Sequence, residues 1–242
     1  MSTIAQLRTV VAGLIAFAAA EEEMLLASAA SDIADPGDER RWAAVPTVAH
    51  NTEFKTQQTE RITAVLTGCA PPTFGEIDHR SPAVYGRYAA PAAVAVAGES
   101  RQVTASLIDG VAALGDDDLV DPTRNPWLNG RPLWLQIVVR GFWHPTGHVA
   151  DYYLGHRQQA RAVALQEHTL TTTRYLGAPN QVAGMAAYSL ACAQAVAGST
   201  EDAARTLAEA IALNPDVRAN ANRDPDLEPL RGSGQLTAIL TR

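Results

Sequence analysis

Apolar residues recur every three or four positions along most of the chain, which is the spacing that gives a helix one apolar face. The first such segment covers about residues 3–30. A second covers 46–68 and begins with a proline, which is favoured in the first turn of a helix. A third covers 84–114, and another proline opens a fourth that extends to residue 166. Six aliphatic positions carry the first segment: Ile4, Leu7, Val11, Leu14, Ala18 and Leu25.

The connections between these segments are long and irregular in composition. Residues 31–41, 69–84 and 116–131 are rich in proline, glycine and charge, which breaks regular structure. Connections of this length let helices cross over rather than only alternate up and down. Long segments in compact domains are often lids or binding loops, although an exposed crossover that binds nothing is the alternative. Four residues are candidates for one wall of a pocket: Phe74, Asp78, His79 and Tyr85.

The C-terminal part has a different pattern. Residues 185–216 predict two short helices around the turn Gly198-Ser199-Thr200, with small and aliphatic residues spaced as in a tetratricopeptide repeat, which this stretch resembles. One such repeat cannot bury its own apolar face. It must therefore lean on the N-terminal helices, on a second copy or protein partner, or on residues 224–232, which have the composition of a cap.

Composition supports an all-α fold. Hydrophobic residues make up 47% of the chain and alanine is abundant, whereas runs of β-branched and aromatic residues are sparse. The length of 242 residues allows a sizeable core. We predict a helical domain over 1–170 and the hairpin with its cap over 180–242.

Charge and cysteine content exclude some function classes. The formal net charge is -7 and the basic residues are scattered, so nucleic acid is not an expected partner. The two cysteines form no C-x-x-C motif, which favours a reducing cytoplasm.

The N-terminus has two interpretations. Arg8 followed by the apolar stretch 9–20 has the form of a secretory signal. The helical pattern continues through Glu21–Glu23, which favours an amphipathic helix of a cytoplasmic protein. No run approaches the roughly 18 apolar residues of a membrane span, so no membrane association is expected.

The strongest candidate chemistry lies in the fourth segment, where His144 and His148 are four residues apart. That spacing lets one helix face offer two imidazoles to one ion. Two imidazoles bind weakly, and His50 of the second segment is the natural third ligand. Three imidazoles would suit zinc, nickel or iron and leave positions for water or substrate. A chance pair of structural histidines is the alternative.

Pro145 and Gly147 interrupt the histidine pair. A proline ring in a helix strikes the carbonyl four residues earlier, which here belongs to Gly141, the residue type best able to absorb the distortion. We therefore predict a kink between Gly141 and Gly147 that displaces His144 and opens the pocket beside the metal.

Several residues are placed to act beside the histidines. Asp151 and Tyr152 follow His148 by three and four positions and so share its helix face. They are candidate catalytic residues, Asp151 as a base and Tyr152 as a hydroxyl donor; a solvated aspartate and a core tyrosine are the alternatives. Arg61 could bind a substrate carboxylate or form a surface ion pair with a glutamate. Three residues make the candidate substrate-binding set: Phe54, Arg61 and Tyr85.

These motifs together resemble the DinB/YfiT-like superfamily over about residues 1–166. The resemblance rests on RWAAVPTVAHNTEF, on HPTGH, and on the long loops between four long helices. The words EIDHRSPAVYGRY and DLVDPTRNPWLNGRPLWLQIV are most similar to its ClbS/DfsB-type branch. The resemblance implies a four-helix bundle with long crossover loops in which His50, His144 and His148 bind a divalent metal.

The resemblance also implies an activity class. Members include transferases and isomerases that use a low-molecular-weight thiol such as mycothiol, and hydrolases that give self-resistance to an electrophilic natural product. We expect a small electrophile as substrate, with thiol transfer ahead of hydrolysis. A non-catalytic ligand-binding or scaffold protein is the third hypothesis.

Overall fold

The computed structural model describes residues 3–28, 34–75 and 81–241. Every regular element in these ranges is helical and none is a strand, so the predicted all-α class is confirmed. The chain divides into two compact units, residues 1–152 and 153–242. The sequence had placed the end of the first domain near residue 170. None of the helices in the described ranges is both long and apolar enough to cross a membrane.

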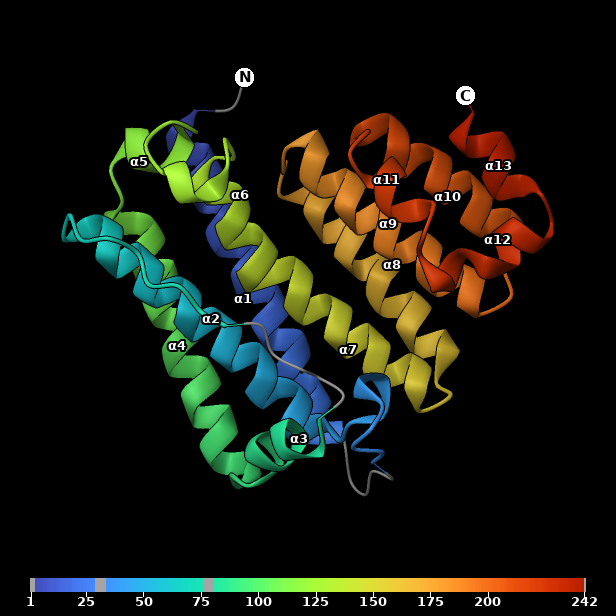
Figure 1. Cartoon of the computed structure of the whole chain (residues 1–242), viewed down its shortest axis with the longest axis horizontal. Helices are drawn as coiled ribbons and strands as arrows, with labels where there is room; N and C mark the ends of the chain where they lie inside the picture. The colour runs from blue at the N-terminus through green and yellow to red at the C-terminus, as the bar shows by residue number, and fades with distance from the viewer. Residues whose placement is uncertain (1–2, 29–33, 76–80, 242) are drawn as a thin grey trace. The chain divides into compact units, whose positions relative to one another are not determined.

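Long helices build the N-terminal unit (Figure 1). They are α1 (Ile4–Ser28), α2 (Ala44–Leu66), α4 (Ala93–Ala113) and a continuous run made of α6 (Leu133–Val138), η3 (Val139–Trp143) and α7 (His144–Gly155). α4 packs against both α1 and α2, and η3 also contacts both. The amphipathic spacing of the sequence thus gives four helical segments that bury their apolar faces together.

Short helices fill the connections. They are η1 (Glu39–Arg41), α3 (Pro82–Ala89), α5 (Asp116–Val120) and η2 (Pro126–Leu128). The single helix predicted over 84–114 is wrong, because α3 ends before Pro91 and α4 starts after it. Proline lacks an N–H and disfavours helical backbone in the residue before it, so the chain turns there.

The prediction that the fourth helix extends to residue 166 is also wrong. α7 ends at Gly155, and Arg157 takes a left-handed conformation with φ 58° before the next helix begins at Gln159. A left-handed residue terminates helical hydrogen bonding. The apolar spacing continues across this turn, which is why the sequence pattern alone did not reveal it.

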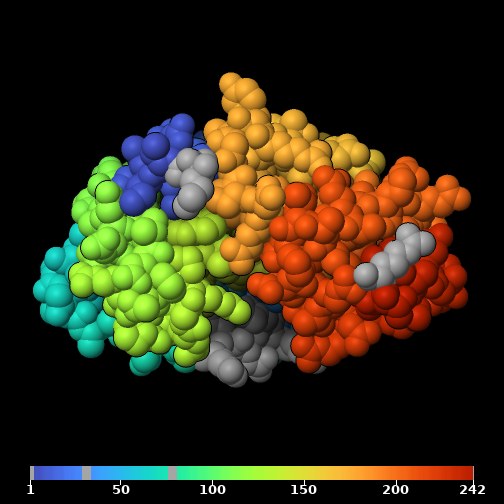
Figure 2. Space-filling model, turned by 90° about the horizontal axis from the view of Figure 1, so that it is seen from above, coloured from blue at the N-terminus to red at the C-terminus, as the bar shows by residue number. Residues whose placement is uncertain are grey.

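The core of the N-terminal unit is aliphatic, with Leu14 and Leu25 of α1 and Leu107 of α4 fully buried. Arg8 ties α1 to the end of α4 by donating to the carbonyls of Val111 and Leu114. In Figure 2 the start of α1, in blue, lies against green residues of the same unit. A hydrogen-bonded arginine therefore closes this end of the helix packing.

The C-terminal unit contains the predicted helical hairpin. α9 (Asn180–Val196) and α10 (Thr200–Leu213) pack against each other, and Gly198 between them has φ 86°. Gly184 permits their close approach, because a Cβ there would lie 2.5 Å from Cβ of Asn214. α8 (Gln159–Tyr175) packs on α9 from the same unit.

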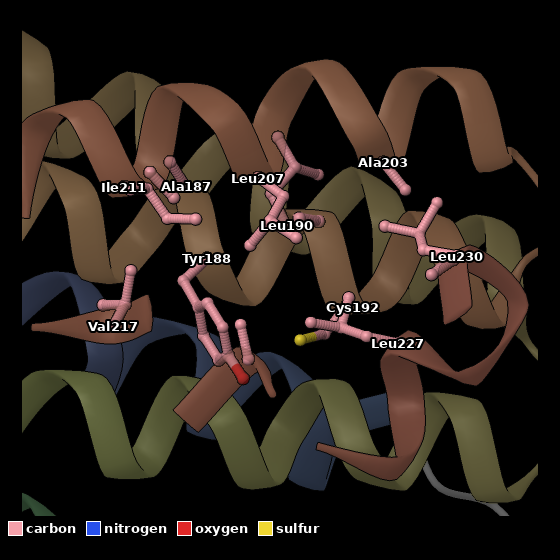
Figure 3. Packing of buried hydrophobic residues seen from close by; sticks show 14 of the residues in the cluster. Ala187, Tyr188, Leu190, Cys192, Ala203, Leu207, Ile211, Val217, Leu227 and Leu230 are labelled. Carbon is pink, nitrogen blue, oxygen red and sulfur yellow. The ribbon is translucent and has the colours of Figure 1, made fainter. Parts of the chain in front are cut away.

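The rest of the C-terminal unit covers the hairpin. α11 (Val217–Ala221), η4 (Pro225–Leu227), α12 (Glu228–Gly232) and α13 (Gln235–Leu240) follow α10. η4 and α12 contact α9, and α12 and α13 contact α10. Figure 3 shows Leu227 beside Cys192 and Leu230 beside Ala203, in the buried apolar cluster that also contains Leu190 and Leu207 of the hairpin. The segment predicted to be a cap therefore packs on the hairpin.

Candidate metal centre

Three histidines converge inside the N-terminal unit. His50 lies in the second turn of α2, and His144 and His148 lie one turn apart at the start of α7. Nε2 of His144 is 3.1 Å from Nε2 of His50, and each of the three rings offers a nitrogen within 4.8 Å of the others. His50 is 1% exposed. The histidines that the sequence singled out are close enough to hold a metal ion.

The donor set fits a divalent ion. Ligand nitrogens about 2.0–2.1 Å from one tetrahedral ion lie roughly 3.3 Å apart, close to the 3.1 Å between His50 and His144. The rings of His50 and His148 are nearly perpendicular, at 83°, with centroids 4.7 Å apart. Imidazoles that approach one point from different directions suit coordination better than they suit stacking.

A π-helical turn brings His144 into the site. Val139–Trp143 forms this turn, and the backbone N–H of His144 donates to the carbonyl of Val139, five residues earlier. Pro145 has no N–H to donate, so a local change of helical register accommodates it next to the turn. The helix is therefore irregular at Gly141, where one turn contains an extra residue, while the predicted kink and the opened pocket stay predictions.

Gly141 serves a purpose that the sequence did not reveal. A Cβ at this position would lie 2.9 Å from Cγ1 of Ile15 and 2.9 Å from Cδ2 of Leu107. The π-helical turn thus approaches α1 and α4 so closely that a side chain at this position would force Ile15 or Leu107 to shift. We had attributed Gly141 to the proline ring alone.

Aromatic rings enclose the histidines. Phe54 lies one turn beyond His50 and stacks on His144 with centroids 4.3 Å apart. Trp42 and Tyr88 meet the His50 ring edge-on, at 6.0 and 5.5 Å. Tyr85 contacts Trp42 at 5.6 Å and so lies one ring away from His50. Apolar walls of this kind exclude water and strengthen the electrostatic interactions inside.

Glu39 is the acidic residue of this site, and the sequence reasoning missed it. Its Oε1 lies 3.7 Å from Nε2 of His50 and 3.5 Å from Nδ1 of His148. Burial, together with the nearby negative charges of Asp151 and Asp38, raises the pKa of Glu39 to about 7, although Arg40 opposes this shift. Only the turn from η1 into α2 brings Glu39 here, so no local pattern could have identified it.

The two predicted catalytic residues have different environments. Asp151 forms an ion pair with Nε of Arg40 at 3.0 Å, and its side chain is 32% exposed. A guanidinium partner holds this carboxylate at the rim. Tyr152 is buried at 4% exposure and lies one turn beyond His148 on α7. Their catalytic roles remain predictions.

Arg61 lies further along α2 and is packed between rings. Its guanidinium carbon is 5.0 Å from the ring centroid of Phe74 and 5.4 Å from that of Trp127. The alternative of a surface ion pair with a glutamate is not what the described residues form. Phe74 therefore does line the neighbourhood of Arg61, whereas the predicted wall residues Asp78 and His79 lie outside the described residues.

We compared the chain with protein-family models, with curated proteins and with solved structures, and none of them matches it.

Proposed function

We propose that this protein is a metal-dependent enzyme that acts on a small electrophilic metabolite, with transfer of a low-molecular-weight thiol such as mycothiol as the reaction. The observation that carries the proposal is the convergence of His50, His144 and His148 within 4.8 Å. The ion would be divalent, with zinc, nickel or iron as the candidates for a site of three imidazoles.

The proposal includes the DinB-like arrangement implied by the sequence resemblance. Four long helical segments and a histidine on α2 opposite a pair on α7 are what that arrangement requires. The long connections at 69–81 and 114–132 are consistent with its crossover loops.

The residues around the cluster have distinct proposed tasks. A divalent ion bound here would supply Lewis acidity that lowers the pKa of a thiol or of water. Oε1 of Glu39 would accept the released proton, since it lies within 3.7 Å of both His50 and His148. Phe54 and Tyr85 would position the substrate beside these groups. Asp151 would keep Arg40 in place, and Tyr152 would donate from the α7 side.

Hydrolysis that gives self-resistance to an electrophilic natural product is the second candidate. Glu39 favours it, because a half-buried carboxylate beside a metal is a suitable base for activating water. The third candidate is a non-catalytic ligand-binding or scaffold protein. This hypothesis predicts that the protein binds metal but turns over no substrate. We retain the cytoplasm as the proposed compartment. A homodimer or a protein partner held by the hairpin also stays a proposal.

Turnover of a reactive electrophile with and without mycothiol tests the proposal. Thiol transfer predicts consumption that needs both mycothiol and metal, with a thioether product. Glu39→Gln should slow this reaction more than it weakens metal binding, because the amide keeps the shape but cannot accept the proton. Consumption without thiol would favour hydrolysis, and no consumption by the metal-loaded protein would contradict both enzymatic proposals.

A further inference from the structure

Two arginines of the N-terminal unit lie on the helical segments that carry the histidines, Arg61 on α2 and Arg140 in η3, directly before α7. Arg140 precedes His144 by one turn, and its guanidinium carbon is 4.5 Å from the ring centroid of Phe54. Phe54 itself stacks on His144. Arg61 follows His50 by 11 positions on α2, which is about three full turns and therefore the same helix face. The site is thus continued by a positively charged region.

These two arginines differ from most of the other arginines that the structure describes in the unit. Among the residues that the structure describes, neither has a carboxylate partner, and Nε of Arg61 is buried without a hydrogen-bond acceptor. Six other arginines of the unit each pair with a carboxylate: Arg8, Arg40, Arg41, Arg87, Arg101 and Arg124. Arg131 also lacks a carboxylate partner but is exposed, so among the described residues of the unit the unpaired and partly buried guanidinium groups are those of Arg61 and Arg140.

The two positive charges repel each other. Burial lowers the pKa of both arginines, and the charge of Arg61 lowers that of Arg140 further. A guanidinium group stays protonated in proteins, so the chain itself does not relieve this repulsion. An anion between the two groups would relieve it and would accept the N–H donors that the described residues leave unused.

The surrounding rings limit the shape of such an anion. Phe74 and Trp127 lie against Arg61, and Phe54 lies against Arg140. Flat apolar surfaces next to cations suit an organic anion with a planar or unsaturated body. A strongly hydrated inorganic ion would gain nothing from them.

We propose that Arg61 and Arg140 form an anion subsite that binds a carboxylate or phosphate group of the substrate. This inference rests on the proposed function in one respect: the reactive end of the substrate would lie at the histidines. Phe54 lies between the two ends on α2, about one turn after His50 and about two turns before Arg61. The substrate class is therefore a small unsaturated electrophile that carries an anionic group several atoms from its reactive carbon.

Binding of simple aromatic anions tests the subsite. The probes are benzoate, phenyl phosphate and the neutral benzamide, titrated at constant ionic strength with the change in thermal midpoint as readout. Benzoate or phenyl phosphate should stabilise the full-length protein saturably, and benzamide should not. Whichever anion binds more tightly identifies the group. The proposal is overturned if benzamide stabilises the protein as much as the anions do. It is also overturned if none of the three probes stabilises the protein.

Variants then locate the binding. Arg61→Gln and Arg140→Gln should each weaken anion binding by roughly tenfold or more, the loss expected for a charged hydrogen bond. Arg101→Gln is the matched control, because it removes an exposed arginine of the same unit and should leave binding unchanged. Equal binding by the wild type and both Gln variants would contradict the subsite. If a Gln variant does not fold, Arg61→Lys and Arg140→Lys replace it, and each should weaken binding by losing the bidentate fork.

A separate arm distinguishes this inference from the metal proposal. Chelator-treated wild type and His148→Ala should both keep anion binding, since neither change touches an arginine. Loss of anion binding in both would assign the anion to the metal and overturn the subsite. If the wild type binds the anion but binds no metal, only the proposed function is contradicted.

Discussion

Lys55 and Gln58 are two buried polar side chains on one helix face that differ in their hydrogen bonding. Both lie on α2 and are at most 1% exposed. Nζ of Lys55 donates to Oε2 of Glu22 at 2.6 Å and to the hydroxyl groups of Ser100 and Thr104. Neither amide atom of Gln58 has a hydrogen-bond partner among the described residues. Hydrogen bonds therefore offset the cost of burying Lys55, whereas none offsets the cost of burying Gln58.

The same replacement at these two positions should therefore have opposite effects. Lys55→Met leaves the Glu22 charge buried and unpaired, and should lower the free energy of unfolding by about 3–5 kcal/mol. Gln58→Met removes an uncompensated amide and should raise it by about 1 kcal/mol. Denaturant unfolding followed by circular dichroism measures both. A stability loss of similar size in the two variants would contradict this assignment.

The two cysteines should differ in reactivity. Cys69 is exposed, whereas Cys192 is buried in the C-terminal unit beside Asp224. Burial, followed by the charges of Asp224 and Asp226, raises the pKa of the Cys192 thiol well above its usual range. Since the thiolate is the reactive form, a disulfide reagent should label Cys69 quickly and Cys192 only after denaturation. Cys69→Ser is the control, and rapid labelling of the native Cys69→Ser protein would contradict the account.

Among the elements, the π-helical turn at Val139–Trp143 is the one that builds the site. It presents His144 to His50 and brings Gly141 against α1 and α4. The turn also carries Arg140 of the proposed anion subsite. One irregular turn thus links core packing to the histidine cluster.

Two glycines on either side of Pro145 provide a matched test of this turn. Gly141→Ala would place Cβ 2.9 Å from Ile15 and Leu107, and should lower the free energy of unfolding by about 1–3 kcal/mol through overpacking. Gly147→Ala meets no atom within 4 Å, and should raise it by about 0.5–1 kcal/mol because it lies inside a helix. The midpoint of thermal unfolding measures both. A tolerated Gly141→Ala would show that the close approach is not required.

Element by element, the sequence predicted what depends on local periodicity. α1, α2 and the hairpin of α9 and α10 were anticipated because apolar spacing and turn residues specify them locally. The breaks at Pro91 and Arg157 were missed, since apolar spacing continues across both. The histidines were found because two of them share a helix face, whereas Glu39 and Arg140 enter the site only through the turn from η1 to α2 and through the π-helical turn.

At the scale of the whole molecule, the histidine cluster and the helical hairpin lie in different units. The histidines, Glu39 and the arginine pair lie within residues 1–152, and the hairpin with its covering helices lies within 153–242. Each unit has an apolar core of its own. The division separates the residues proposed to do chemistry from those proposed to bind a partner.

The central claim is that His50, His144 and His148 hold one divalent ion, and metal content tests it directly. Elemental analysis of the purified protein should give about one ion per chain for the wild type. His50→Ala and His148→Ala should lose it, since two imidazoles bind weakly. His168→Ala, which removes an exposed histidine of α8, is the control and should keep the metal. Wild type without a stoichiometric divalent metal, or both site variants retaining it, would contradict the account.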